Sequence, residues 1–536
     1  MIGGLGFVAE NNWVSQRSAL DLTRSNIDPG NPAFQPMLND LQANILKGHG
    51  RAFAHHVFLE LRPSQIAEAK TWIAEFAADR ITSAWKLEQG RQLFKTTGAD
   101  GGAVFTLSIS ATGYAALGFD SDHLPKELQT PANSIVGDPA AFPAGAKASA
   151  TKLGDGDVRA NWEPPFQNNV DVLLLVADDD PNKASQLAES IVQAAMAFSK
   201  VLLNQKGHVL YREAAHAGHI GIEHFGYADG ISQPLFFKDE IDAQANNNNW
   251  NDAEPLNLVL VPDPHGQDFN SFGSFLVFRK LEQNIAGFMS AEERSIPPIM
   301  DADGIVNKDM AGAMIVGRFR NGNPLITSRG FTGDIRYESQ ISNDFDYSNE
   351  SPPPPSSHTQ YGAKCPFFAH TRITNPRNDI KVVPPTFVHS VRLTRRAIPY
   401  QDVSRFGKGN ENLLTVTGGQ LNDNRPETGV GLLFMSYQAH IGKQFEFIQN
   451  NWANHGHIAG RNIGPDGVIG QLSPLPSGLP FKPAQPDLQP RRLPTQWGNA
   501  VDPATPDISF GGFVKNKGAE YFFTPSISFL RLLTVS

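Results

Sequence analysis

Val170-Asp171-Val172-Leu173-Leu174-Leu175-Val176-Ala177 is the stretch that sets the fold class of this chain. Its apolar residues are nearly continuous, which is typical of a well-buried strand. Three aspartates and Pro181 follow at once, and these residues favour the start of a helix. Apolar residues then recur on one helical face as far as Phe198, and 208–212 predicts the next strand. This strand, helix and strand in succession predict mixed α and β structure.

The same succession extends in both directions along the chain. In the first half the sequence predicts strands at 56–61 and 105–110 and a helix at 64–78. In the second half it predicts strands at 273–279, 388–394 and 431–437 and a helix at 440–452. Because strand–helix–strand units are mixed with hairpin-like strands, we expect an α+β fold and not a doubly wound sheet. Two ferredoxin-like halves with antiparallel sheets and flanking helices fit this order.

Changes in composition suggest where the halves begin and end. Residues 1–37 are polar and predict an N-terminal extension. The first half then covers 38–238, and the second covers 256–536. The segment 239–255 between them is polar and rich in asparagine, which is typical of a linker.

Composition and charge exclude several classes of protein. The chain has 536 residues, of which 40% are hydrophobic and 18% charged, as in an ordinary globular protein. A net charge of −9 argues against nonspecific binding of nucleic acid. A single cysteine excludes an internal disulfide framework and a site with several cysteine ligands. With no apolar run near ~18 residues and no basic segment before the N-terminal apolar patch, we expect a soluble, cytoplasmic protein that does not enter a membrane. Secretion by another route stays open.

Gly226-Tyr227-Ala228-Asp229-Gly230-Ile231-Ser232-Gln233-Pro234 places one carboxylate between two glycines. Glycine allows the backbone to turn sharply or to approach a flat ligand closely, and the proline ends the segment rigidly. A single carboxylate held on a tight turn in apolar surroundings is suited to acid–base chemistry beside a bound cofactor. The alternative is a turn in which Asp229 only bonds nearby backbone.

Cys365-Pro366-Phe367-Phe368-Ala369-His370-Thr371-Arg372-Ile373-Thr374-Asn375-Pro376-Arg377 joins a histidine to two arginines. A buried neutral imidazole is a good ligand for iron, and arginines suit carboxylates such as the propionates of haem. The alternative is a core histidine that bonds a backbone carbonyl.

Val391-Arg392-Leu393-Thr394-Arg395-Arg396-Ala397-Ile398-Pro399-Tyr400 contains two adjacent arginines. On a strand, neighbouring side chains point to opposite faces, so one of the pair can point inward. The alternative is a pair of solvated surface arginines.

These three motifs, in this order, resemble the dye-decolourising peroxidases, a family of haem peroxidases unrelated to the plant and animal types. Gly431–Phe434 with Tyr437-Gln438, Gln444–Gln449 and Pro465–Gln471 match as well. Asp40–Arg51 is similar to the opening signature of the larger bacterial and fungal subclass. The resemblance covers the chain from about residue 38 to the end.

The resemblance implies two ferredoxin-like domains, with haem b mainly in the C-terminal one. It implies that His370 is the proximal iron ligand and that Asp229 is the distal acid–base residue. Arg395 corresponds to the distal arginine, and Arg396 is the less favoured member of its pair. Further residues implied to contact the cofactor are Ile231, Ser232, Arg372, Arg377, Leu432, Phe434 and Asp466, the last of which is expected to bond the ring N–H of His370.

A peroxidase is the function that follows: it would reduce hydrogen peroxide and oxidise dyes, phenols and similar small aromatic donors, as a monomer or a small homo-oligomer. The alternative is a protein that binds, stores or senses haem with little turnover. Because binding alone needs neither Asp229 nor Arg395, their presence favours the peroxidase. A third alternative, a hydrolase with a metal on His216 and His219, lacks the glutamate that accompanies such a pair.

In the family's architecture the haem lies too deep for a bulky dye, which implies that electrons pass through a surface aromatic residue. Tyr400 and Trp452 are the candidates, and each is also compatible with simple packing. Two departures from the family's pattern stand out. Val430 occupies a place before Leu432 where the family often has Arg, and Ala397 provides no polar side chain near Arg395.

Overall fold

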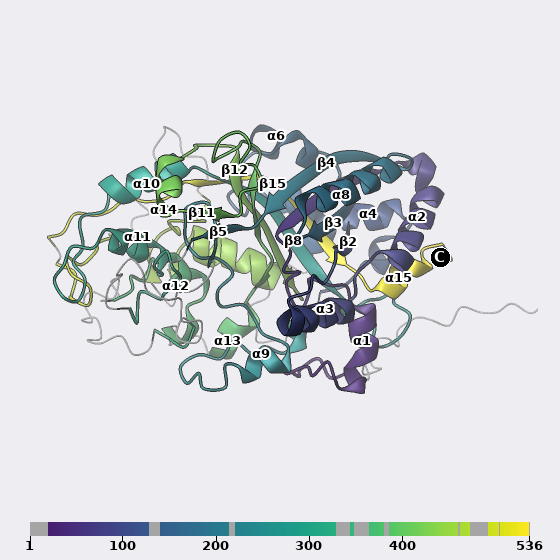
Figure 1. Cartoon of the computed structure of the whole chain (residues 1–536), viewed down its shortest axis with the longest axis horizontal. Helices are drawn as coiled ribbons and strands as arrows, with labels where there is room; N and C mark the ends of the chain where they lie inside the picture. The colour runs from purple at the N-terminus through teal and green to yellow at the C-terminus, as the bar shows by residue number, and fades with distance from the viewer. Residues whose placement is uncertain are drawn as a thin grey trace, which may run out of the picture.

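The computed structural model of the chain describes residues 20–127, 140–213, 220–328, 343–347, 364–379, 385–458, 461–471, 491–502 and 504–534 (Figure 1). A large antiparallel sheet runs through its middle. From edge to edge its strands are β10 (Ile398–Gln401), β12 (Val430–Gln438), β8 (Phe272–Gln283), β15 (Val514–Thr524), β2 (Val104–Ser110), β3 (Val172–Asp178), β1 (Phe53–Leu61) and β4 (Ser199–His208). Two short strands extend it, β7 (Val261–Pro262) beside β8 and β9 (Thr394–Arg395) beside β12.

Strands from both halves of the sequence share this one sheet. The joint is made by β15, which pairs with β8 over most of its length and with β2 at Phe522↔Ser110 and Phe523↔Ile109. The sheet curls until its two edges meet, since a Cβ atom at Gly207 in β4 would lie 2.8 Å from Cγ2 of Ile398 in β10. In the described part of the chain no strand pairing joins these edges, so the barrel is not closed. The predicted α+β class is confirmed, and the boundaries at 37, 238 and 255 stay predictions.

Helices cover the sheet on both sides (Figure 1). Those of the first half are α1 (Gln35–Asp40), α2 (Ile66–Asp79), α3 (Ala84–Thr97), α4 (Ala111–Ala116), α5 (Ala141–Ser149), α6 (Val158–Asn161), α7 (Pro164–Gln167), α8 (Pro181–Ala195) and α9 (Lys238–Asp242). Those of the second half are α10 (Ile285–Arg294), α11 (Lys308–Val316), α12 (His370–Thr374), α13 (Pro385–Ser390), α14 (Gly418–Asp423), α15 (Ile527–Leu532) and the π-helical segments η6 (Gly442–Glu446) and η7 (Ile448–Asn454).

Smaller elements complete the fold. A second sheet contains β11 (Thr415–Val416), β5 (Leu210–Arg212) and β6 (Ile220–Ile222), and β13 (His457–Ile458) pairs with β14 (Arg461–Asn462). Single 3₁₀ turns occur at η1 (Pro32–Phe34), η2 (Pro63–Gln65), η3 (Ser121–His123), η4 (Leu256–Leu258) and η5 (Arg377–Asp379). Among the described residues, no helix is both long and apolar enough to cross a bilayer.

The strand and helix that set the fold class form as the sequence predicts. The Asp180 side chain accepts hydrogen bonds from the backbone N–H groups of Asn182 and Lys183, and Pro181 occupies the first turn of α8. The helix ends at Ala195, before Phe198, and an additional strand, β4 at 199–208, follows it. The strand predicted at 208–212 forms next, as β5 at 210–212.

The strand predicted at 388–394 is wrong. Residues 385–390 form α13, in which Pro385 stands at the first position, and only Thr394 of the predicted stretch pairs in a strand. Proline at that position is preorganised for a helix, and the alternation of Val391 and Leu393 is too short to outweigh it.

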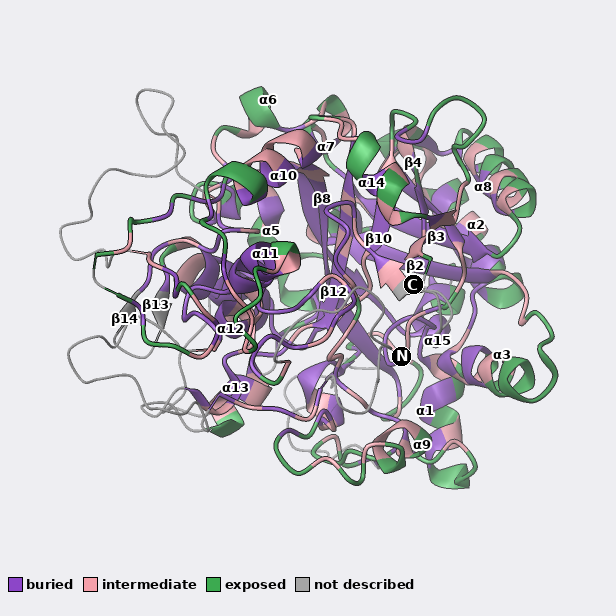
Figure 2. Cartoon of the chain, turned by 60° about the vertical axis from the view of Figure 1, so that its left-hand side comes forward, coloured by how far each residue is buried: buried purple, intermediate pink, exposed green. Residues whose placement is uncertain are grey.

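Two hydrophobic cores lie along the sheet, and most of its strand residues are buried (Figure 2). The edge strand β4 is the least buried, because Lys200 and Lys206 are exposed and residues 201–204 are half-buried. The larger core packs the helices of the first half against the sheet. The second lies under α10, α11 and α12 and includes Phe288, Met314 and Phe368. Within the predicted linker 239–255, Trp250, Asp252 and Glu254 are buried, so the end of this segment belongs to the packed molecule.

Candidate functional site

The glycine-flanked turn holds Asp229 by its backbone. The Asp229 N–H donates to the carbonyl oxygen of Gly221 in β6 at 3.0 Å, and the Ala228 N–H donates to that of Arg320 at 3.0 Å. Gly226 and Gly230 have positive φ angles of 90° and 77°, which a residue with a Cβ adopts only under strain. The carboxylate accepts the Gly230 N–H at 2.7 Å, as in a simple turn, but it also lines a cavity.

Arg395 reaches the same cavity from β9. Pairing of Arg395 with Ser436 of β12 fixes its backbone, and its Nη2 donates to the carbonyl oxygen of Ile231 at 2.8 Å. Its Nη1 lies 3.7 Å from Oδ1 of Asp229. Arg396 points elsewhere and donates to the carbonyl oxygens of Asn44 and Ile45. Strand alternation therefore separates the two arginines, as the sequence predicts.

His370 begins α12 and also lines this cavity. Its Nδ1 lies 2.9 Å from Oδ2 of the fully buried Asp466. Burial alone would raise the pKa of Asp466, but the imidazole and the N–H groups of Ile469 and Val468 hold that pKa below its ordinary value. A carboxylate on Nδ1 leaves Nε2 as the nitrogen available to a ligand.

The cavity has a volume of about 260 Å³. One wall is apolar and is formed by side chains of β12 and of the turn. These are Leu432, Phe434 and Ile231, with Ser232 beside them. Eight of the ten predicted catalytic and cofactor residues therefore line this one cavity; the exceptions are Arg372 and Asp466.

Arg377 is a buried cation at the edge of this cavity. Its Nη1 donates to the carbonyl oxygens of Asn343, at 2.7 Å, and Phe345, and its Nη2 donates to the Ser232 hydroxyl at 3.3 Å. In the described part of the chain no carboxylate pairs with it. Arg377 and Ser232 also have positive φ angles, 49° and 59°, and strained residues concentrate at ligand sites. A buried, unpaired guanidinium beside a cavity fits a ligand that carries carboxylates, as haem does.

Arg372 does not reach the cavity. It forms a two-pronged ion pair with Asp379, with both N–O distances at 2.9 Å, and packs 4.2 Å from the ring centre of Phe367. Its role in the structure is to hold α12 against η5.

Tyr400 and Trp452 were expected at the surface, and that expectation is wrong. Tyr400 is 1% exposed and Trp452 is 3% exposed. The Lys280 ammonium lies 4.8 Å from the ring centre of Tyr400, and the ring of Trp452 packs against that of Phe447. Neither residue can meet a dye directly.

Sequence reasoning did not single out Arg392 and its partners, although Arg392 stands in a quoted motif. Its guanidinium pairs with Asp252 at 2.6 Å and with Glu254 at 2.7 Å, and it lines the cavity. Both carboxylates lie in the segment predicted to be a linker. Acidic residues near a polar asparagine run look solvated in the sequence, and only their pairing with a distant arginine buries them.

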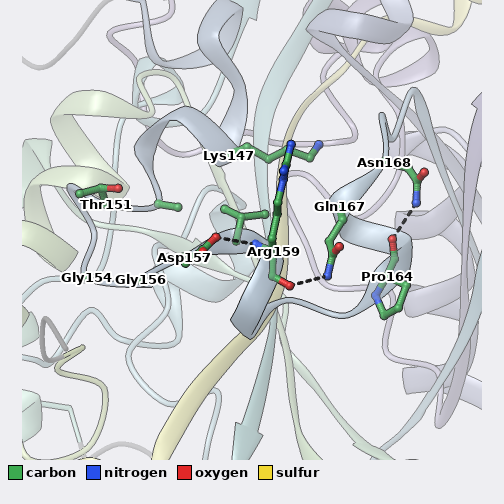
Figure 3. Close-up of a pocket in the computed structure, with 11 residues that line it drawn as sticks. Lys147, Thr151, Gly154, Gly156, Asp157, Arg159, Pro164, Gln167 and Asn168 are labelled. Atoms are coloured by element: carbon green, nitrogen blue, oxygen red, sulfur yellow. Dashed lines mark hydrogen bonds between the residues drawn. The ribbon is translucent and has the colours of Figure 1, made fainter.

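A second, larger cavity of about 980 Å³ lies on α5, α6 and α7 (Figure 3). Lys147 and Arg159 line it, together with polar Thr151, Gln167 and Asn168. None of the residues predicted for the site reaches it. His216 and His219 lie outside the described residues, and among those described no group of three metal-ligating side chains is placed to hold an ion.

Comparison with known proteins gives one consistent result. A family model described as the DyP dimeric α+β barrel domain matches residues 40–210. The multifunctional dye peroxidase DyP2 of an Amycolatopsis strain is 36% identical, over 93% of this chain and 96% of its own length. A dye-decolorizing peroxidase of Exidia glandulosa is 29% identical, over 92% and 86%. The crystal structure of a DyP-type peroxidase of Anabaena superposes with a TM-score of 0.77 at 34% identity, over 96% of this chain and 99% of that one.

Proposed function

Because this chain belongs to the dye-decolourising peroxidase family, we propose that it binds haem b with His370 on the iron and uses hydrogen peroxide to oxidise dyes, phenols and similar aromatic donors. It is a peroxidase, since its likeness to peroxidases extends along nearly its whole length. One observation carries the proposal for the site. A single cavity brings together His370, braced by Asp466, and the pair Asp229 and Arg395.

His370 and Asp466 are suited to hold the iron. If the Nδ1–H of His370 donates to Oδ2 of Asp466 over 2.9 Å, the lone pair of Nε2 is directed away from the carboxylate. The partial negative charge shared across this bond also makes the imidazole a stronger electron donor. Haem, when bound, supplies the iron at which peroxide is reduced.

Asp229 is the proposed proton carrier. Before the O–O bond of hydrogen peroxide breaks, one oxygen must lose a proton and the other must gain one. The Asp229 side chain is 30% exposed toward the cavity, and its free oxygen, Oδ2, can take that proton and return it. A positioned acid–base group contributes ~10²–10⁴-fold to a rate.

Arg395 is proposed to stabilise the negative charge that develops on the leaving oxygen. Its backbone is fixed by β9 and its Nη2 by the Ile231 carbonyl, so Nη1 is held near Asp229 without a close ion pair. A donor fixed in advance needs no reorganisation during the reaction. The apolar wall of Leu432 and Phe434 keeps bulk water away from this pair.

Arg377 and Ser232 are proposed to bind a propionate of the haem. The guanidinium and the hydroxyl are already bonded to each other, and a carboxylate would give the buried cation the anion it lacks. Most residues that line the cavity come from positions after 256, which supports a haem mainly in the C-terminal half.

The test is reconstitution with haem, a visible spectrum, and stopped-flow mixing with hydrogen peroxide. We expect a Soret band that is lost in His370→Ala and kept in Asp229→Ala, with a spectral reaction with peroxide that is much slower in Asp229→Ala. A Soret band without any reaction would mean that the site binds haem without turning it over. A band unaffected by His370→Ala would refute the assigned ligand.

A further inference from the structure

Tyr227 stands two residues before Asp229 and also lines the cavity. Its hydroxyl donates to Oε1 of Glu292 in α10 at 3.1 Å, and both residues are buried. Gly312 of α11 packs so closely on this pair that any side chain there would overlap the phenol oxygen and Glu292. The surrounding atoms therefore hold the phenol and the carboxylate in fixed positions relative to each other.

Arg320 connects this pair with the outside of the molecule. Its Nη2 bonds Oε2 of Glu292 at 2.6 Å, and its guanidinium lies 4.6 Å from the ring centre of Tyr227. On the other side its Nε lies 3.6 Å from Oδ1 of Asp309, whose side chain is 32% exposed. One layer of side chains thus separates the ring of Tyr227 from solvent.

We propose that Tyr227 is a redox-active residue that passes electrons singly from donors at the Arg320 and Asp309 surface into the cavity. This inference rests on the proposed function. In the first step Tyr227 gives one electron to the peroxide-oxidised cofactor, and its phenolic proton moves to Oε1 of Glu292. In the second step a donor gives one electron to the neutral phenoxyl radical, and Glu292 returns the proton. Each cycle restores Tyr227 and Glu292 and oxidises the donor by one electron.

The carboxylate is what makes this step feasible. A phenol that loses an electron becomes a strong acid, so a base within hydrogen-bonding distance lets the proton leave with the electron. The cation of Arg320 would oppose a positive charge on the ring, but the ring stays neutral when the proton leaves. Arg320 also pairs with Oε2 of Glu292 at 2.6 Å, which leaves Oε1 as the oxygen that accepts the phenolic proton.

Two other buried aromatic residues, Tyr521 and Trp250, do not line the cavity. Tyr521 donates to Glu446 at 3.0 Å, but Phe445 lies between it and the cavity. Trp250 packs between the cations of Arg377 and Arg392 and does not line the cavity.

Tyr347 provides a matched control. It lines the same cavity and lies under a guanidinium, that of Arg372, at the same 4.6 Å from the ring centre. Within the described residues, however, its hydroxyl has no carboxylate partner. A comparison of Tyr227→Phe with Tyr347→Phe therefore isolates the effect of the neighbouring base.

The experiment is freeze-quench EPR of the haem-loaded enzyme, mixed with hydrogen peroxide without a donor, with ring-deuterated tyrosine used to identify a tyrosyl signal. We expect a tyrosyl radical in the wild type and in Tyr347→Phe, and its loss in Tyr227→Phe. Glu292→Gln should also reduce the signal, because an amide does not accept the proton. The Soret band and the rate of its change with peroxide are recorded for every variant, so that loss of the radical is interpreted only where peroxide still reacts.

The possible outcomes distinguish a failure of this inference from a failure of the proposed peroxidase function. If peroxide reacts normally but the radical persists in Tyr227→Phe, or disappears in Tyr347→Phe instead, Tyr227 is not the residue. If peroxide reacts and no tyrosyl radical forms in the wild type, the inference also fails while the peroxidase site stands. If the wild type does not react with peroxide, both fail.

Discussion

Arg377 illustrates, at the scale of one residue, how a ligand site costs stability when empty. Its guanidinium is buried and bonds only neutral groups in the described structure. Burial, together with the charges of Arg318 and Arg392, lowers the pKa of Arg377 to about 9. A buried charge without a counterion destabilises a folded protein, and an apolar side chain of similar length removes that cost.

We therefore expect Arg377→Met to leave the haem-free protein as stable as the wild type or more stable, and to weaken haem binding by at least about tenfold, which corresponds to ~1.4 kcal/mol. The measurements are the thermal midpoint of the haem-free protein and a haem titration. Arg392→Met is the control: it removes the buried guanidinium that pairs with both Asp252 and Glu254, so it should lower the midpoint. Equal losses of stability in both variants would contradict the assignment of Arg377.

Asp229 and Arg395 give a second prediction at this scale. Asp229→Asn keeps the shape of the turn but cannot carry a proton, so the peroxide reaction should slow by ~10²–10⁴-fold. Arg395→Leu should slow it by ~10²–10³-fold through loss of the charge-stabilising donor. Arg396→Leu, which alters the neighbouring guanidinium outside the cavity, should react at the wild-type rate in stopped flow. A strong effect of Arg396→Leu would mean that the two arginines are assigned the wrong way round.

Motifs shared with the family were enough to select His370, Asp229, Arg395 and Asp466, because short motifs fix what lies on a turn or strand. The roles of these residues stay proposals. Exposure could not be predicted in the same way. Tyr400 is covered by Lys280, which stands 120 positions away in the sequence on β8. Whether an aromatic residue reaches solvent is decided by such distant segments, and the sequence around Tyr400 contains no sign of them.

At the scale of elements, α12 depends on an ion pair that fastens it to η5. Arg372 bonds both oxygens of Asp379, and both residues are buried. Arg372→Ala should destabilise the protein by about 3–5 kcal/mol, because it removes the guanidinium that bonds both oxygens of the buried Asp379. Since His370 begins α12, the variant should also bind haem more weakly.

Arg492→Ala is the control for this prediction. Arg492 forms an ion pair with Asp507 at a similar 2.8 Å, but the side chains are 25% and 55% exposed. Surface pairs contribute at most about 1 kcal/mol, so denaturant unfolding should hardly distinguish this variant from the wild type. Similar losses in the two variants would show that burial of Arg372 and Asp379 does not set the cost.

Most elements were predictable because their patterns are local. β3, α8 and β12 form where continuous or periodic apolar residues and caps place them. The structure of the stretch 388–394 was not predictable in this way. Its two alternating apolar residues are too short a pattern to outweigh a helix that begins at Pro385. The pairing of β2 with β15 could not be predicted either, because it joins Ser110 to Phe522, which lie far apart in the sequence.

At the scale of the whole molecule, four of the buried histidines have pKa values far below the ordinary one, and all four lie away from His370. Burial is the main cause, and nearby arginines add to it for His49 and His224 and neighbouring histidines for His56. The pKa of His49 and His208 is lowered to about 4 and that of His56 and His224 to about 3. In the unfolded chain a histidine titrates near ~6.5. Below that pH the unfolded state binds more protons than the folded state, so each histidine removes stability as the pH falls from about 6.5 toward 3–4.

His56 isolates one such contribution. It is fully buried in β1, and among the described residues neither ring nitrogen has a hydrogen-bond partner. A pKa difference of one unit corresponds to ~1.4 kcal/mol, so at pH 5 the histidine should cost roughly 2 kcal/mol relative to pH 7.5. Buried carboxyls such as Asp155 and Asp263 have raised pKa values and act in the opposite direction, so the total slope is not the informative quantity.

The informative quantity is the difference between the wild type and His56→Phe, because the carboxyls and the other histidines are common to both. His56 already packs 6.1 Å from the ring of Phe278, so a phenylalanine keeps an aromatic ring in the same place. We expect denaturant unfolding to give similar stability for both at pH 7.5 and an advantage of roughly 2 kcal/mol for His56→Phe at pH 5. Parallel loss of stability in the two proteins would mean that His56 gains a proton without unfolding, and that water reaches this part of the core in acid.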